Sequence, residues 1–329
     1  MCMLPRGAFV AGAAAVLSAP SMAGAQVVDE RPPTVDTEHP IEVASGVFVL
    51  RDHRVWLVPN IGIVLGKDAA LVIDTGLGPH DGERVLRLAR QLAGKRKLYL
   101  TTTHFHPEHS YGAQIFKSEA TIIANRAQRD ELVQKGERYV RLFRQTQSRA
   151  AAAALEGTRI VMPDAVYDGP SEQLDLGGRK VGFHWWGLAH TRGDQVINLP
   201  AERILFAGDL VENPMFPIFP WFPPTDTELD PARWISILRG FQRFRPKLVV
   251  SGHGDPGTID VSLQIASYIQ IVGNRVSHLA ALGKTAREII RDNKPEFIAL
   301  HPEWLHPNLI DWQIKYFVAN PNSARARQC

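Results

Sequence analysis

Short hydrophobic stretches separated by turn residues occupy the first part of the chain and predict β-strands. They cover residues 47–50, 55–58, 62–65 and 70–73. The spacing of the apolar residues then becomes helical, which predicts a helix after Asp81. Asp81 is a good N-cap, and Gly94 lies at the C-terminal end. A strand expected at 97–101 completes a strand, helix, strand order, which is typical of a βαβ unit.

The rest of the chain combines further strands with long helices. Residues 125–155 have a helical pattern with many charges, which predicts either an inserted lid or a solvated outer helix. A helix is expected after Asp230, because Pro231 suits the first helical position. The other expected strands are 159–162, 166–167, 173–176, 180–185, 195–199, 204–206 and 248–251. The other expected helices are 259–282, one beginning at Thr285, and 306–319.

The first 25 residues predict an export signal, with a short buried helix as the alternative. Arg6 precedes a short apolar run at 8–17, and Ala23-Gly24-Ala25 is a cleavage sequence before Gln26. The run is too short to cross a bilayer of about 30 Å as a helix, and no later stretch is long and apolar enough. We therefore expect a periplasmic or secreted protein without integral membrane association.

Removal of the signal would also remove Cys2 and leave Cys329 as the sole cysteine, so no internal disulfide is expected. No repeat or linker divides the remaining chain, which predicts one domain over 26–329. The full sequence of 329 residues is 45% hydrophobic and 22% charged, with a formal net charge of +3, as in ordinary globular proteins. The weak charge and the lack of a Lys/Arg block argue against nucleic-acid binding.

Three of the twelve histidines lie within six residues, directly after the strand expected at 97–101. His104 and His106 are two positions apart, so on an extended segment both side chains point to the same side. Glu108 and His109 then add a carboxylate and a third imidazole. Imidazole and carboxylate groups are the usual ligands of zinc and also serve iron or manganese. So dense a cluster predicts a metal site.

Three further candidate ligands follow later predicted strands: His190, Asp209 and His253. Glycines beside each of them permit tight turns that aim a side chain into a common cleft. A single histidine after a strand is more often a structural residue, so each of these signals is weak alone. Their order after the first cluster strengthens the interpretation.

Together with Asp74 in a Val-Ile-Asp-Thr-Gly segment, this series resembles the metallo-β-lactamase superfamily, from residue 43 to about residue 257. The resemblance implies an α/β fold of four layers, an αββα sandwich, with metals at one edge between the sheets. Here it would carry a helical insertion and a helical C-terminal tail. Asp74 would support the ligands by hydrogen bonding, the alternative being a turn or N-cap aspartate.

Carried over position by position, the resemblance implies two metal sites that share a bridging carboxylate. The first set of ligands would be His104, His106 and His190. The second set would be Glu108, His109 and His253, and Asp209 would bridge the two. The family normally has aspartate where this chain has Glu108, whose extra methylene moves the carboxylate outward by about 1.5 Å. The second site could therefore be weakened or take a different ion.

The implied reaction is hydrolysis of a small-molecule substrate with one or two Zn²⁺ ions, with iron or manganese as alternatives. Glu108 is the candidate to hold or transfer the proton of the attacking water. Asp209 matches the bridging residue of members similar to glyoxalase II and lactonases, which β-lactamases generally lack. An ester, thioester, lactone or amide bond is expected, and β-lactam hydrolysis stays open because of the expected export.

Two other functions also stay open: an iron oxygenase of the persulfide dioxygenase type, with one metal, and a member without catalysis. The loop at 213–224 is aromatic and rich in proline, and either lines the substrate cleft through Phe216, Phe219 and Trp221 or packs on the core. His184, Trp185 and Trp186 are expected to be core residues of a strand.

Overall fold

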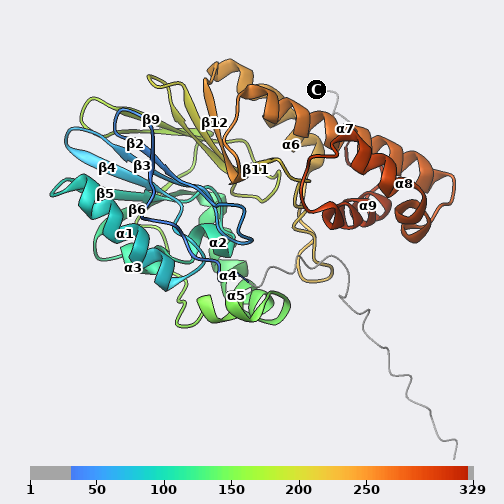
Figure 1. The fold of residues 1–329 in the computed structure, drawn as a ribbon, viewed down its shortest axis with the longest axis horizontal. Coiled ribbons are helices and arrows are strands. Elements are labelled where there is room, and N and C mark those ends of the chain that lie inside the picture. Colours follow the sequence, from blue (N-terminus) through green and yellow to red (C-terminus); the bar gives the residue numbers. More distant parts are fainter. Residues whose placement is uncertain (1–30, 325–329) are drawn as a thin grey trace, which may run out of the picture.

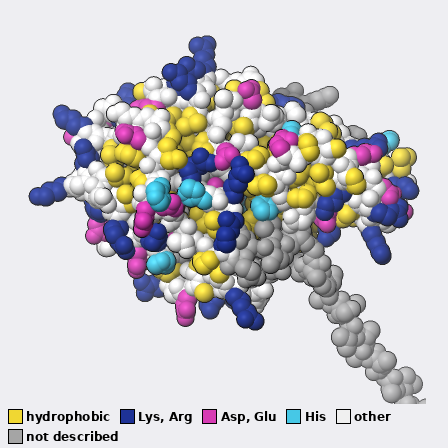
Figure 2. All heavy atoms as spheres, in the orientation of Figure 1, with side chains coloured by type: hydrophobic (Ala, Val, Ile, Leu, Met, Phe, Trp, Pro, Cys, Tyr) yellow, Lys and Arg dark blue, Asp and Glu magenta, His cyan; other side chains and the backbone are white. Residues whose placement is uncertain are grey.

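The structure, a computed structural model, describes residues 31–324. The predicted export signal, including Cys2, and the terminal Cys329 lie outside the described residues. Among the helices that are described, none is both long and apolar enough to cross a membrane. On the face shown in Figure 2, basic side chains are interspersed with acidic and hydrophobic ones.

Two sheets stack face to face and helices cover their outer faces, which confirms the predicted αββα sandwich (Figure 1). The first sheet follows chain order, antiparallel from β1 to β4 and parallel from β4 to β7. Its strands are β1 (Ile41–Ala44), β2 (Val47–Leu50), β3 (Ile61–Leu65), β4 (Ala69–Ile73), β5 (Lys97–Thr101), β6 (Ala120–Asn125) and β7 (Ala165–Tyr167).

The second sheet has the order β12-β11-β10-β9-β8, in which only β11 and β12 are parallel neighbours. Its strands are β8 (Ser171–Asp175), β9 (Lys180–Trp185), β10 (Gln195–Leu199), β11 (Ile204–Asn213) and β12 (Leu248–Gly254). Hydrophobic side chains from both sheets meet between them, among them Leu71 of β4 and Phe206 of β11. Val72, the neighbour of Leu71, points the other way and packs with α1 (Pro79–Ala93).

The helices fall into three groups around the sandwich. Near the first sheet lie α1, α2 (Pro107–Ser110), α3 (Ala113–Phe116), α4 (Arg126–Thr146) and α5 (Arg149–Ala154). The second sheet is covered by α6 (Pro231–Gly240), a 3₁₀ turn (Phe241–Phe244) and α7 (Ile259–Ala281). The C-terminal group packs against α7 at one end of the molecule (Figure 1) and consists of α8 (Ala286–Leu300), a 3₁₀ turn (Pro307–Leu309) and α9 (Ile310–Ala319).

Three local predictions were wrong. Residues 55–58 form turns instead of a strand, and Leu57 there has a left-handed φ of 62°. Residues 159–162 are irregular. The first long helix begins at Pro79, so Asp81 lies in its first turn and is not the N-cap. The buried Asp81 carboxylate instead accepts the backbone N–H of Val35 at 3.0 Å.

The charged segment at 125–155 forms α4 and α5. Ion pairs and a hydrogen bond hold α4 against the rest of the protein. The buried Lys135 ammonium lies 2.9 Å from Oδ2 of Asp226 and 2.7 Å from Oε2 of Glu228. One turn later, the Tyr139 hydroxyl donates to Oδ2 of Asp226 at 2.8 Å. The Tyr139 ring also stacks on the His106 imidazole, with centroids 5.4 Å apart. These contacts join α4 to the segment that bears the histidine cluster.

Candidate metal centre

The seven candidate ligands come together at one edge of the two sheets, and all are buried. His104 and His106 follow β5, and α2 begins at Pro107, so Glu108 and His109 stand in the first turn of a short helix. The remaining three ligands come from the second sheet. His190 lies in the loop between β9 and β10, Asp209 lies in β11 at a break in its register with β12, and His253 lies near the end of β12.

Two glycines allow the strands to approach so closely. A Cβ on Gly252 would stand 2.0 Å from Oδ1 of Asp209, and a Cβ on Gly208 would stand 2.6 Å from Cβ of Thr103. Gly208 also has a left-handed φ of 54°, which favours glycine. A larger residue at either position would therefore push apart the segments that carry the candidate ligands.

The first group of donors consists of His104, His106, His190 and Asp209, whose ligand atoms lie within 4.8 Å of one another. Nδ1 of His106 lies 2.9 Å from Nε2 of His104 and 3.3 Å from Nε2 of His190. Oδ2 of Asp209 lies 3.7 Å from Nε2 of both His104 and His190. Two nitrogens bound to one tetrahedral zinc at about 2.0–2.1 Å would be separated by roughly 3.3 Å. The spacing of these atoms therefore suits a single cation.

The second group consists of Glu108, His109, Asp209 and His253, again with ligand atoms within 4.8 Å of one another. Oδ1 of Asp209 lies 3.1 Å from Nε2 of His109 and 3.7 Å from Nε2 of His253. Asp209 thus presents one oxygen to each group. The structure brings together all seven residues that the sequence selected, in the two sets that the resemblance implied.

Hydrogen bonds from the opposite ring nitrogen aim three of the imidazoles. Nδ1 of His109 lies 2.9 Å from Oδ2 of Asp74, Nδ1 of His253 lies 2.9 Å from the Val58 carbonyl oxygen, and Nδ1 of His190 lies 3.2 Å from the Ile218 carbonyl oxygen. These oxygens only accept, so each Nδ1 carries the proton. In the neutral ring, Nε2 then has a free lone pair directed toward the ligand cluster.

The Asp74 carboxylate forms hydrogen bonds with His109 and Thr103, as expected for a residue that supports the candidate ligands. The φ of Asp74 is 69°, and its carboxylate accepts the Thr103 backbone N–H at 2.6 Å and the Thr103 hydroxyl at 3.0 Å, besides the His109 ring. The same hydroxyl oxygen lies 3.2 Å from Nδ1 of His104. Asp74 therefore orients ligands of both groups.

Burial sets the charge state of the first group. It lowers the pKa of His104 and His106 well below the usual range and that of His190 to about 4, so these rings are neutral at pH 7. For Asp209, the imidazoles of His109, His253 and His104 outweigh burial and hold the pKa well below its usual value. Asp209 is therefore ionised, and neutral imidazole and ionised carboxylate are the forms that bind metal.

The second group behaves differently in the absence of a cation. Burial lowers the pKa of His109, but the Asp209 and Asp74 carboxylates outweigh it, and the net result is a pKa well above the usual value. Burial also raises the pKa of Glu108. A divalent cation next to these groups would favour the deprotonated form of each.

Unpartnered polar atoms support the assignment of a metal centre. Within residues 31–324, both carboxylate oxygens of Asp209, Nε2 of His109, Nε2 of His253 and Oε2 of Glu108 are buried without a hydrogen-bond partner. Buried polar atoms are rarely left in this state, because each one costs the free energy of its lost hydration. Two divalent cations would satisfy all of them, and the nitrogen and oxygen donors suit zinc.

One buried carboxylate close to the second group was not predicted. Glu212 is paired in register with His253 across β11 and β12, and its Oε2 accepts the Ile218 N–H at 2.7 Å. Its Oε1 is buried without a hydrogen-bond partner. Burial and the neighbouring Asp209 charge raise the pKa of Glu212 well above its usual value. The sequence signal was its position three residues after Asp209, but the strand was expected to end at 206.

The aromatic loop after β11 is mainly part of the core, which is the second of the two alternatives that its sequence left open. Phe216 and Phe219 are 0% and 3% exposed and pack among the C-terminal helices, where Phe219 contacts Phe317. Trp221 is half-buried, and its ring contacts Tyr316 edge-on. Of the residues expected in a core strand, His184 and Trp185 do lie in β9 and Trp186 follows it, but all three are half-buried.

Comparison with known proteins agrees with this architecture. A family model described as the metallo-beta-lactamase superfamily matches residues 54–253. The chain is 24% identical over 218 residues to a linear primary-alkylsulfatase from Pseudomonas sp. (strain ATCC 19151), which covers 59% of this chain and 41% of that protein. It is 29% identical over 184 residues to the acyl-coenzyme A thioesterase MBLAC2 of Gallus gallus, which covers 51% of this chain and 64% of that protein. The chain thus spans less than two thirds of these relatives.

Solved structures share the fold at low identity. The DIM-1 metallo-beta-lactamase superposes with a TM-score of 0.55 at 19% identity, over 71% of this chain and 98% of that chain. The sec-alkylsulfatase Pisa1 from Pseudomonas sp. gives a TM-score of 0.62 at 16% identity, over 84% of this chain and 49% of that chain.

Proposed function

Because the chain belongs to the metallo-beta-lactamase superfamily, we propose that it is a metal-dependent hydrolase with two zinc ions. The observation that carries this proposal is the pair of buried donor groups joined by Asp209, with unpartnered atoms facing one another. His104, His106 and His190 would hold one ion, Glu108, His109 and His253 would hold the other, and Asp209 would contact both.

When bound, two divalent cations would lower the pKa of a water molecule and polarise the bond to be cleaved. The protein's own contribution is positioning and proton transfer. Oε2 of Glu108 is buried without a partner within the second donor group, so this carboxylate is placed to take up a proton from a water molecule held there. Glu108 would accept the proton that the attacking water loses and would pass it to the leaving group as the bond to that group breaks.

The substrate class is an ester, thioester, lactone or amide. Support comes from two kinds of relative: one is named a thioesterase and another an alkylsulfatase, and both names describe hydrolysis of small molecules that carry a leaving group. The completeness of the second donor group, Glu108 included, favours a hydrolase with two metals over an oxygenase with one iron. We also propose that the protein is exported after cleavage at Ala25, which N-terminal sequencing of the periplasmic protein would test.

Elemental analysis of the purified protein, combined with a panel of ester, thioester, lactone and β-lactam substrates, tests the proposed reaction. We expect two zinc ions per chain, activity that a chelator removes and zinc restores, and a Glu108→Gln variant with about 10²–10⁴-fold lower turnover. Glu119→Gln, on the protein surface, is the control for loss of a carboxylate. Unchanged turnover in Glu108→Gln would remove this residue from the mechanism, and activity that survives chelation would refute the proposal.

A further inference from the structure

The candidate ligand His190 is oriented by a loop that has no regular secondary structure. Nδ1 of His190 lies 3.2 Å from the Ile218 carbonyl oxygen, whereas Nδ1 of His109 is held by the Asp74 carboxylate. Residues 216–220 belong to no helix or strand, so no sheet or helix fixes the Ile218 carbonyl. This carbonyl can aim the His190 ring only if other contacts hold the loop in place.

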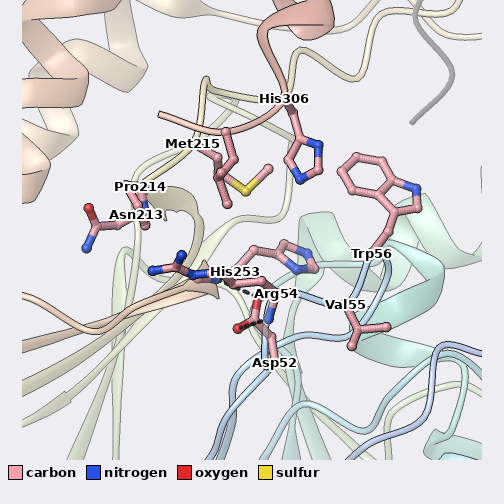
Figure 3. Close-up of a pocket in the computed structure, with 11 residues that line it drawn as sticks. Asp52, Arg54, Val55, Trp56, Asn213, Pro214, Met215, His253 and His306 are labelled. Carbon is pink, nitrogen blue, oxygen red and sulfur yellow. Dashed lines mark hydrogen bonds between the residues drawn. The ribbon is translucent and has the colours of Figure 1, made fainter. Parts of the chain in front are cut away.

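The first part of this loop lies next to the metal centre and is held by its backbone. Residues 213–215 line the same small pocket as the candidate ligand His253 (Figure 3). The Leu305 N–H donates to the carbonyl of residue 214 at 2.9 Å, and the N–H of residue 216 donates to the Leu305 carbonyl at 3.1 Å. Beyond these contacts, side chains hold the peptide bond between residues 217 and 218.

Two buried polar side chains hold that peptide bond from opposite sides. Oε2 of Glu212 accepts the Ile218 N–H at 2.7 Å, and the Gln313 side-chain amide donates to the Pro217 carbonyl at 2.7 Å. Glu212 and Gln313 are each only 1% exposed. The C=O and N–H groups of a planar trans peptide point in opposite directions, so the two contacts fix the orientation of one rigid unit. The next carbonyl along the chain, that of Ile218, is the one that accepts from His190.

Each of the two side chains belongs to a different part of the fold. Glu212 lies in β11, three residues after the candidate bridging ligand Asp209. Gln313 lies in α9, and its Oε1 accepts the hydroxyl of Tyr268 in α7 at 2.8 Å. The loop is therefore tied both to the strand that carries Asp209 and to the C-terminal helices.

We propose that Glu212 and Gln313 are positioning residues of the first metal site, which act through the Ile218 carbonyl on the His190 imidazole. The proposal rests on the proposed function, which places a zinc ion at His190. A carbonyl held in this place keeps the ring proton on Nδ1 and turns the lone pair of Nε2 toward the other ligands. The C-terminal helices thus contribute to a metal site although none of the candidate ligands lies in them.

Zinc binding by variants of both residues tests this assignment. Glu212→Ala removes the acceptor of the Ile218 N–H, and Gln313→Met removes the donor to the Pro217 carbonyl without changing the charge. Competitive titration against a chromophoric chelator should show zinc affinity at the first site about tenfold lower in each variant, the lower end of what loss of a supporting partner costs. Glu212→Gln removes the charge but keeps an acceptor oxygen, and should bind zinc more tightly than Glu212→Ala.

NMR spectra of the zinc-loaded protein with isotope-labelled histidine show which imidazole changes, and a His190→Gln variant assigns the signals of His190. In Glu212→Ala and Gln313→Met, the Nδ1–H proton of His190 should move upfield and exchange faster with water, because its hydrogen bond is weaker. In Gln313→Met the signals of His109 should stay unchanged, because Asp74 still holds that ring.

Asp81→Ala and Gln270→Met are the matched controls, and thermal melting confirms that all variants are folded. Asp81 is a buried carboxylate that accepts the backbone N–H groups of residues 35 and 77, and the Gln270 amide donates to the carbonyl of residue 324. These hydrogen bonds lie outside the loop, so zinc affinity and the His190 signals should match those of the wild type.

The proposal is overturned if Glu212→Ala and Gln313→Met bind zinc as the wild type does, or if the controls weaken zinc binding equally. It is also overturned if Glu212→Gln binds no more tightly than Glu212→Ala, because lost charge then explains the effect. Assays of the same proteins on the substrate panel separate this failure from failure of the proposed function. Hydrolysis by the wild type with unchanged zinc affinity in the variants refutes the positioning role alone. The expected zinc affinities without hydrolysis of any substrate uphold that role and refute the hydrolase.

Discussion

Replacing Asp74 with asparagine should weaken the second metal site selectively, through the tautomer of His109. The Asp74 carboxylate accepts three hydrogen bonds: from the Thr103 N–H, the Thr103 hydroxyl and Nδ1 of His109. Asparagine has one oxygen and one NH₂ group in their place. If its oxygen keeps the 2.6 Å bond to the Thr103 N–H, its NH₂ group faces Nδ1 of His109.

A donor in that position favours the tautomer of His109 with its proton on Nε2, the atom that points to Asp209. That nitrogen can then bind a cation only after losing the proton, so affinity falls. Loss of such a supporting partner typically costs tenfold to 100-fold in metal affinity, or about 1.4–2.7 kcal/mol. The backbone itself should tolerate the change, because asparagine adopts a φ such as the 69° of Asp74 more readily than most residues.

Competitive zinc titration against a chromophoric chelator would measure both sites, with cobalt spectra reporting their coordination. Asp81→Asn is the matched control, because Asp81 is also a buried carboxylate that accepts backbone N–H groups but is not a candidate ligand. We expect one weakened site in Asp74→Asn and two unchanged sites in Asp81→Asn. Equal weakening in both variants would show a general loss of stability and refute the tautomer argument, as would unchanged zinc affinity in Asp74→Asn.

Two further substitutions test packing and charge. A Cβ at position 252 would stand 2.0 Å from Oδ1 of Asp209, so Gly252→Ala should lower the zinc content at both sites, as measured by elemental analysis. Gly169→Ala is the control, because a Cβ there has no neighbour closer than 3.5 Å, and its zinc content should be unchanged. Lys135→Met removes a buried cation that contacts three carboxylates. Denaturant unfolding at pH 7 should show that the free energy of unfolding falls by about 3–5 kcal/mol. A loss below about 1 kcal/mol would contradict the assigned ion pairs. In the wild type, Arg192 and Lys135 hold the pKa of Glu228 at about 2, below its usual 4.5. Stability should therefore fall as pH drops from 4.5 toward 2, and this loss should be smaller in Lys135→Met; identical pH curves would exclude the coupling.

The fold and the ligand set were predictable because both depend on local patterns in a fixed order. His104, His106 and His109 are close in sequence, and a strand followed by a short helix turn is enough to bring them together. The prediction that His190 and His253 are ligands required the family resemblance, because nothing near either residue in the sequence indicates which strand ends become neighbours. The structure supplies that information as the pairing of β11 with β12 and the packing of the two sheets.

Predictions failed where tertiary contacts override local pattern. Residues 55–58 are all apolar, as in a buried strand, yet they form turns in which the Val58 carbonyl accepts from His253 instead of a neighbouring strand. Phe216 and Phe219 are apolar on either interpretation of their loop, and only the presence of the C-terminal helices decides that they are core.

The C-terminal helices hold the loop that continues from the strand bearing Asp209. Asp209 and residue 213 belong to one strand, and the loop that continues from it is held by the C-terminal segment: Gln313 donates to the Pro217 carbonyl at 2.7 Å, and Leu305 exchanges backbone hydrogen bonds with 214–216. The candidate ligands end at His253, whereas the contacts that hold this loop come from residues 305 and 313. A change in the C-terminal segment can therefore shift this loop without replacing any candidate ligand.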